Sequence, residues 1–201
     1  MRDFHTHDPG TPLRALISTS GEALPGKLCS LQYHPWDLPE NFSLLPPDFA
    51  VRAARYAAIG EAGLDQLHGA PPEVQINALR QIFAVAAKVN KPLVCHVVKM
   101  YEEFFALRKE FPEVRVMLHG FRGKPEMVAR LWHNDITVSF HPDIITRQEV
   151  VKMLHQPAGS FGFESDDKKV DLREIITAAA ELAGNPDLEA ISDANFEKFI
   201  G

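Results

Sequence analysis

At 201 residues and with a formal net charge of -6, the chain has no basic field of the kind that captures nucleic-acid duplexes. Its 45% hydrophobic and 24% charged residues are ordinary for a soluble globular protein with one large core. No apolar run reaches the length of a signal peptide or a membrane span, so we expect a cytoplasmic protein with no membrane partner. The two cysteines, Cys29 and Cys95, have no disulfide or metal-binding spacing and are expected to pack as reduced thiols.

Short apolar runs alternate with amphipathic stretches along most of the chain. The expected strands cover residues 1–6, 13–19, 28–33, 56–60, 93–97, 114–118, 136–140 and 161–164. After the fourth of these, a helical pattern separates each strand from the next, as in repeated βα units. We therefore expect an α/β fold, namely one TIM-like (β/α) barrel that forms a single domain over residues 1–201.

Helical periodicity is clearest over residues 73–90, where Leu79, Ile82, Phe83 and Ala86 lie on one apolar stripe. Further helices are expected over residues 100–110, after 123–125, after 146, over 171–184 and over 195–200.

Capping signals mark two of these helices. Thr146 with Glu149, and Asp171 with Glu174, have the spacing of a capping box, and Gly184 is expected to end the second helix. The segments between the first three strands, by contrast, are short and rich in proline and glycine. A full crossover helix needs about a dozen residues, so we expect the first helices of the barrel to be reduced or missing.

Six histidine and carboxylate side chains fall at the expected carboxyl ends of strands: His5, His7, Glu61, His96, His119 and Asp166. Alternation along a strand points His5 and His7 to the same side. Glu61 is expected where the fourth strand ends in a tight, glycine-punctuated turn. Each residue alone is explained as well by a hydrogen-bonded core histidine or a helix-capping acid. Side chains at the carboxyl ends of barrel strands surround the active site, so their shared position favours one metal site.

This ligand set suits a pair of divalent ions, and we expect Glu61 to bridge them. The other ligands are expected to divide as His5, His7 and Asp166 on one ion and His96 and His119 on the other. Imidazole-rich ligation favours zinc, while carboxylate and water leave room for manganese or magnesium. Two such ions polarise a phosphoryl or acyl group and activate water near neutral pH.

The order and spacing of these residues resemble the TatD family of metal-dependent hydrolases, within the amidohydrolase-like barrels. The matching motifs span nearly the whole chain: Asp3-Phe4-His5-Thr6-His7, Tyr33-His34-Pro35, Ala58-Ile59-Gly60-Glu61-Ala62-Gly63-Leu64-Asp65, Lys91-Pro92-Leu93-Val94-Cys95-His96, Leu118-His119-Gly120-Phe121, Glu164-Ser165-Asp166 and Asp193-Ala194-Asn195-Phe196-Glu197-Lys198-Phe199. The resemblance implies a metal-dependent phosphodiesterase of deoxyribonuclease type, with the six residues above as ligands and phosphate esters such as DNA ends or nucleotides as partners.

The resemblance also implies roles for individual residues. His34 would lie beside the substrate or its phosphate. Asp166 would bind metal and orient or deprotonate the attacking water, with Glu61 as the bridging carboxylate. Asp65 is expected either to support the ligands from behind or to fix its own turn.

The chain departs from the family pattern at several points. It is shorter than is usual in the family, and the loss falls in the first two helices. Lys99 stands where the family often has arginine, so it would meet a phosphate as a point charge without arginine's planar fork. Arg122 replaces a small residue and would either hold a phosphate or obstruct the pocket. Asp167-Lys168 stands in place of a serine-proline pair.

Two other functions stay open. An amidohydrolase-like enzyme would hydrolyse a small amide, lactone or ester, with Lys99 and Arg122 holding a substrate carboxylate. A shortened, non-catalytic relative would bind a ligand or partner, and a second copy of the chain would cover the core that the missing helices expose.

Several residues are not assigned a chemical role. Four histidines are expected on the solvated surface, namely His68, His133, His141 and His155. Of these, His141 follows a strand and could reach the barrel mouth. Trp36 and Tyr101 are expected to cover loops.

Overall fold

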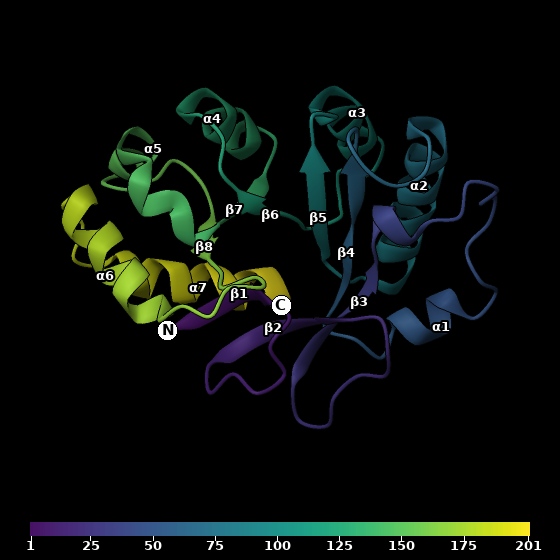
Figure 1. Ribbon diagram of the computed structural model, residues 1–201, viewed down its shortest axis with the longest axis horizontal. Helices are drawn as coiled ribbons and strands as arrows, with labels where there is room; N and C mark the ends of the chain where they lie inside the picture. The colour runs from purple at the N-terminus through teal and green to yellow at the C-terminus, as the bar shows by residue number, and fades with distance from the viewer. The chain divides into compact units, whose positions relative to one another are not determined.

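The computed structural model describes residues 1–201, and the chain divides into two compact units. We call Met1–Ile17 with Met117–Gly201 the terminal unit, and Ser18–Val116 the central unit. Figure 1 shows the strands and helices of each. Strand β2 (Arg14–Thr19) runs across the first boundary, and β6 (Val116–Phe121) begins at the second. None of the helices has both the length and the apolar character needed to cross a membrane.

The terminal unit brings strands from both ends of the chain into one parallel sheet. Besides β6 and the start of β2, its elements are β1 (Arg2–Thr6), α4 (Pro125–His133), β7 (Ile136–Phe140), the 3-10 helix η2 (Pro142–Thr146), α5 (Gln148–Met153), β8 (Phe161–Phe163), α6 (Leu172–Ala183) and α7 (Leu188–Ile200). β1 pairs with β2, and β7 pairs with β8. A parallel bridge between Thr6 and Asp166 then joins the end of β1 to the segment after β8. The first and last strands thus meet as they do at the closing seam of a barrel.

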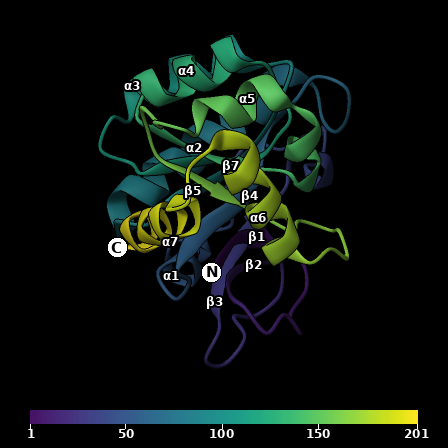
Figure 2. The same cartoon turned by 90° about the vertical axis from the view of Figure 1, so that its left-hand side faces the viewer.

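Alternation along β1 separates an apolar face from a polar one. Phe4 is fully buried and packs edge-on against Phe196 of α7, with ring centroids 5.2 Å apart. It also covers Gly162 of β8, where a Cβ atom would lie within 2.2 Å of its ring. Asp3 and His5, one position away on either side, therefore point to the opposite face. Figure 2 shows α7 beside α6, the two helices that close the chain.

The central unit is a three-stranded parallel sheet with β4 in the middle. Its elements are β3 (Leu28–Tyr33), the 3-10 helix η1 (Pro35–Asp37), α1 (Phe49–Ala53), β4 (Ala58–Asp65), α2 (Pro72–Val89), β5 (Leu93–Val98) and α3 (Tyr101–Glu110). β4 pairs with β3 on one side and β5 on the other. Helix α2 packs on β4 and buries the predicted stripe, which includes Leu79, Ile82 and Phe83.

Most of the expected elements are confirmed. No helix separates β1, β2 and β3, and only η1 and the five-residue α1 come between β3 and β4, so the early helices are reduced as expected. Asp171 caps α6 by accepting a hydrogen bond from the Arg173 N–H, and Gly184 ends that helix in the left-handed conformation, with φ of 63°. The last helix begins earlier than expected, at Leu188.

The capping box expected at Thr146 is wrong. Helix α5 begins at Gln148, and its N-cap position is Arg147, which makes no side-chain cap hydrogen bond. Thr146 instead ends η2, where its hydroxyl donates to the Asp143 carbonyl at 2.7 Å. Thr146 is therefore the last residue of the short helix η2, whereas the sequence pattern places it at the start of α5.

The turn expected after Gly60 is also wrong, because β4 continues as a strand through Asp65. A Cβ atom at Gly60 would lie 2.2 Å from the Val94 carbonyl oxygen, and one at Gly63 would lie 1.8 Å from the His96 carbonyl oxygen. The glycines are thus required by the close approach of β5, not by a turn. Glu61 lies inside the strand as a result.

Candidate metal centre

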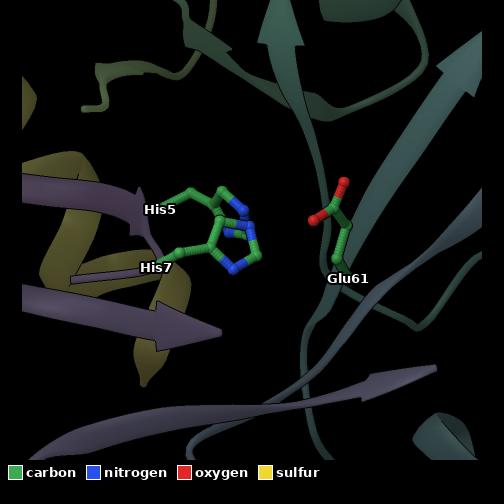
Figure 3. A group of neighbouring side chains, drawn as sticks. All are labelled: His5, His7 and Glu61. Atoms are coloured by element: carbon green, nitrogen blue, oxygen red, sulfur yellow. The ribbon is translucent and has the colours of Figure 1, made fainter. Parts of the chain in front are cut away.

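Four of the six expected ligands lie in the terminal unit, and the structure brings them together. The His5 ring lies 5.0 Å from the His7 ring and 4.3 Å from the His119 ring, measured between centroids. Figure 3 shows His5 and His7 projecting from the end of β1, and it also draws Glu61 on β4. The Asp166 Oδ1 atom lies 3.9 Å from His5 Nε2 and 3.8 Å from His7 Nε2. Imidazoles grouped around one carboxylate are a ligand set for a divalent transition metal.

Asp3 ties this cluster to the backbone on both sides. Its Oδ1 accepts from the Ser165 N–H at 3.1 Å and from the His5 N–H at 3.3 Å, and its Oδ2 accepts from the Ser165 hydroxyl at 2.7 Å. Burial raises the pKa of Asp3 to about 7, against the opposing effect of the Ser165 hydrogen bonds. Asp3 therefore fixes His5 and the segment that carries Asp166, a role that sequence reasoning missed although the residue stands in the His5 motif.

Glu164 supports His119 from behind. It is fully buried, its Oε1 accepts from the Gly120 N–H at 2.7 Å, and the same atom lies 3.4 Å from His119 Nδ1. Burial raises the pKa of Glu164, but hydrogen bonding to His119 and the charges of His119 and His5 outweigh it and hold the pKa below its usual range. A carboxylate on one ring nitrogen orients a histidine so that the other nitrogen can bind metal.

The central unit carries the second cluster. Glu61 is 5% exposed, and its Oε1 lies 3.1 Å from His34 Nε2 and 3.2 Å from His96 Nδ1. The three residues have ligand atoms within 4.8 Å of one another, as do His5, His119 and Asp166 in the terminal unit.

A bulge in β4 sets the direction of Glu61. Ile59 pairs with Leu93 but Ala62 pairs with Cys95, so β4 has one more residue than β5 over this interval. The same shift occurs against β3. Bulges of this kind redirect a side chain from the regular alternation of a strand, and they recur next to active sites.

Asp65 orients His96. Its Oδ2 accepts from the Trp36 indole N–H at 2.7 Å and lies 3.2 Å from His96 Nε2, while its Oδ1 accepts from the Leu67 N–H. Burial raises the pKa of Asp65, but the hydrogen bonds from Trp36, Leu67 and His96 outweigh it and hold the pKa below its usual range. When Nε2–H of His96 points to Asp65, Nδ1 faces Glu61 with a lone pair.

The expected substrate-binding residues have different surroundings. His34 is buried beside Glu61. Lys99 is exposed directly after β5, in the left-handed conformation with φ of 57°. Arg122 is half exposed, and its guanidinium lies 3.7 Å from the carboxylate of Asp143.

The expected surface position of His141 is wrong, because this side chain is only 1% exposed. It follows β7 directly, and Pro142 starts η2 immediately after it. A signal for this position is present in the sequence, since a histidine-proline pair after an expected strand also occurs at His34-Pro35.

Alternating strands and helices, with a histidine–carboxylate cluster in each unit, define a class of protein: an α/β fold of TIM-barrel type with candidate metal-binding groups. The TatD related DNase family matches residues 14–199, so the chain belongs to that family. The family recognised from the sequence motifs is thereby confirmed.

Relatives agree with this assignment. YJJV, a TatD homologue from Escherichia coli K12, is 18% identical and matches with a TM-score of 0.74 over 98% of this chain and 95% of its own. A hydrolase TatD family protein from Entamoeba histolytica is 16% identical and matches with a TM-score of 0.61 over 72% of this chain and 63% of its own. These likenesses confirm the TIM-like α/β barrel fold. Deoxyribonuclease Tat-D of Schizosaccharomyces pombe is 29% identical over 107 residues, which are 51% of this chain and only 34% of that relative.

Proposed function

We propose that the chain is a divalent-metal-dependent phosphodiesterase of deoxyribonuclease type, acting as one hydrolase domain over residues 1–201. The observation that carries the proposal is a histidine–carboxylate cluster in each unit, with ligand atoms within 4.8 Å of one another. Membership of the TatD related DNase family and the name of the fission-yeast relative favour nucleic-acid phosphodiesters, such as DNA ends or nucleotides, as substrates. The free, buried thiols of Cys29 and Cys95 suit a reducing compartment such as the cytoplasm.

In this proposal the residues that would hold metal are His5, His7, His119 and Asp166 in the terminal unit and Glu61 and His96 in the central unit. The donor set fits zinc, manganese or magnesium. His96 Nδ1 and Glu61 Oε1 lie 3.2 Å apart, and both carry lone pairs when His96 Nε2–H points to Asp65, so a cation between them relieves their repulsion. When bound, the ions polarise the phosphoryl group and acidify the attacking water.

The protein residues position the substrate and move the proton. The Asp166 side chain is 19% exposed, so it can reach solvent, and we assign to it the orientation and deprotonation of the attacking water. His34 directs its Nε2–H to Glu61 and keeps that carboxylate in place. The exposed Lys99 and Arg122 supply positive charge for the substrate phosphate.

The decisive variant is Glu61→Gln, which keeps the shape of the side chain and removes its charge. Loss of a residue behind a ligand already costs about 10- to 100-fold in metal affinity or activity, so we expect this change to lower kcat/KM on a phosphodiester by at least about 100-fold. Elemental analysis should show less bound metal. The matched control is Glu103→Gln, the same change on an exposed residue of the central unit. Unchanged turnover and metal content in Glu61→Gln would refute the proposal.

A substrate panel distinguishes the proposal from its chemical alternative. Single-stranded DNA and a chromogenic phosphodiester are compared with small amides, lactones and carboxylic esters, at equal metal loading. Cleavage of the phosphodiesters is expected. Cleavage of the amides or lactones alone would transfer the assignment to an amidohydrolase-like reaction, in which Lys99 and Arg122 hold a carboxylate.

A further inference from the structure

His141 lies at the carboxyl end of β7, beside the acids that follow β8. Phe140 and Phe163 are paired in register, and the Glu164 N–H donates to the Phe140 carbonyl at 3.3 Å. His141 is thus the β7 neighbour of Glu164, whose carboxylate touches His119. At 1% exposure it belongs to the buried polar rim of the terminal unit.

The hydrogen bond at one ring nitrogen fixes the state of the other. His141 Nδ1 accepts from the Asp143 N–H at 3.1 Å and caps η2. The Asp143 carboxylate lies 3.3 Å from the same nitrogen, but it is exposed and also lies beside Arg122, so we assign the lone pair of the capping bond to Nδ1. A neutral ring then carries its single proton on Nε2. Burial and then the charge of Arg122 lower the pKa of His141 despite the nearby acids, which favours the neutral ring.

The Nε2–H of His141 is buried and has no hydrogen-bond partner in the protein. Burying a donor without an acceptor is costly, and each such group in a native structure calls for an explanation. Metal ligation does not provide one, because a ligating nitrogen needs a lone pair and this one carries the proton. The atom is therefore a donor that lacks an acceptor.

His34 is built in the same way in the central unit. It follows β3, its Nδ1 accepts from the Trp36 N–H at 3.3 Å, and Pro35 starts the 3-10 helix η1. Its Nε2–H points to a carboxylate oxygen of Glu61 at 3.1 Å. In the central unit the histidine-proline cap thus presents its Nε2–H to a carboxylate oxygen. In the terminal unit the same N–H of the cap has no acceptor in the protein.

We propose that His141 donates its Nε2–H to a non-bridging oxygen of the substrate phosphoryl group. A neutral donor aimed at an anion makes a charge-assisted hydrogen bond, and that bond strengthens as charge develops on the phosphoryl oxygens during displacement. His141 is then a substrate-positioning residue for the terminal-unit cluster. The inference rests on the proposed function, since it takes the reacting group to be a phosphoryl group.

Two substitutions separate this role from a structural one. His141→Asn keeps a cap acceptor near the Nδ1 position, because asparagine is among the best N-caps, but it removes the Nε2 donor. His141→Gln places an amide N–H near the Nε2 position and loses the cap. His133→Asn, the same change on an exposed helical residue of the same unit, is the control.

We expect His141→Asn to melt close to the wild type but to lose about 10- to 100-fold in kcat/KM on a phosphodiester, the value of one hydrogen bond to a charged group. His141→Gln should retain more activity while melting at a lower temperature. A purely structural role predicts the reverse order, with His141→Asn active and His141→Gln impaired in both measurements. That reverse order would overturn the inference.

Inorganic phosphate provides a readout that does not depend on turnover. Calorimetric titration of the metal-loaded protein should show phosphate binding to the wild type and weaker binding to His141→Asn. If the wild type cleaves no phosphodiester yet His141→Asn binds phosphate more weakly, the proposed function fails and the role of His141 stands. Equal phosphate affinity in the two proteins, or none in the wild type, would overturn the inference about His141.

Discussion

The two units hold their histidine–carboxylate clusters by different means. In the central unit Glu61 and His96 project from the interior of β4 and β5, and all eight residues of β4 are buried. In the terminal unit Asp166 lies beyond the end of β8, in the left-handed conformation with φ of 55°. The sheet therefore positions one carboxylate, whereas a loop segment positions the other.

Hydrogen bonds to β1 compensate for the shorter strand in the terminal unit. The Asp166 N–H donates to the His5 carbonyl at 3.0 Å, and the His7 N–H donates to the Asp166 carbonyl at 3.1 Å. The Asp3–Ser165 contacts add side-chain bonds across the same seam. Changes in strand spacing should therefore damage the central unit most, and changes in single side chains should damage the terminal unit most.

The largest effect is expected from Gly63→Ala, which tests the dependence on strand spacing. The new Cβ would lie 1.8 Å from the His96 carbonyl oxygen and 2.7 Å from the carbonyl carbon, both backbone atoms that cannot move without separating β4 from β5. We expect a loss of more than about 4 kcal/mol in the free energy of unfolding, or no folded protein at all. Chemical denaturation followed by circular dichroism measures it.

Gly21→Ala is the matched control, because a Cβ there meets only the Thr19 hydroxyl at 3.6 Å. It should unfold like the wild type. A Gly63→Ala protein with wild-type stability would mean that the two strands are not held at this spacing.

Glycine also explains which parts of the fold could be read from the sequence. The apolar stripe of α2 and the Asp171 cap of α6 depend on neighbours in the sequence, so periodicity and spacing predicted them. The extent of β4 depends on β5, about thirty residues further on, because a glycine is equally suited to a turn and to a close strand contact. The sequence for this reason predicts a turn after Gly60, where the structure has the second half of β4.

The candidate site was predictable to a similar degree. The types of the candidate ligands and their order along the chain can be predicted from the sequence, since histidines and acids that follow apolar runs form a local pattern. For Asp65 a supporting role is one of two expectations, and the structure places it against His96. The supporting roles of Asp3 and Glu164 cannot be predicted in this way, because they depend on contacts that only the folded chain creates. The expected surface position of His141 is wrong because the burial of this side chain depends on packing in the folded chain and not on its neighbours in the sequence.

In the terminal unit the corresponding test removes a side chain, and Asp3→Ala is the sharpest choice. It leaves the Ser165 N–H and the His5 N–H without this acceptor, and the Ser165 hydroxyl keeps only Thr6 Oγ1 at 2.9 Å. We expect a loss on the order of 2–4 kcal/mol in the free energy of unfolding. Asp3→Asn keeps an acceptor oxygen and should cost much less, so equal losses in the two variants would contradict this account.

The smallest effect is expected from Asp65→Asn, a change to a supporting side chain of the central unit. An amide NH2 facing His96 Nε2 favours the tautomer with the proton on Nδ1, the nitrogen that faces Glu61. Metal affinity, measured by competition with a chelator, should fall by about 10- to 100-fold, and the fold should persist because the amide oxygen, at the Oδ1 position, can still accept from the Leu67 N–H. The exposed Asp37→Asn is the control. Unaltered metal affinity in Asp65→Asn would mean that the sheet alone holds His96 in the orientation that binds metal. The central unit would then need no side-chain support of the kind that Asp3 gives the terminal unit.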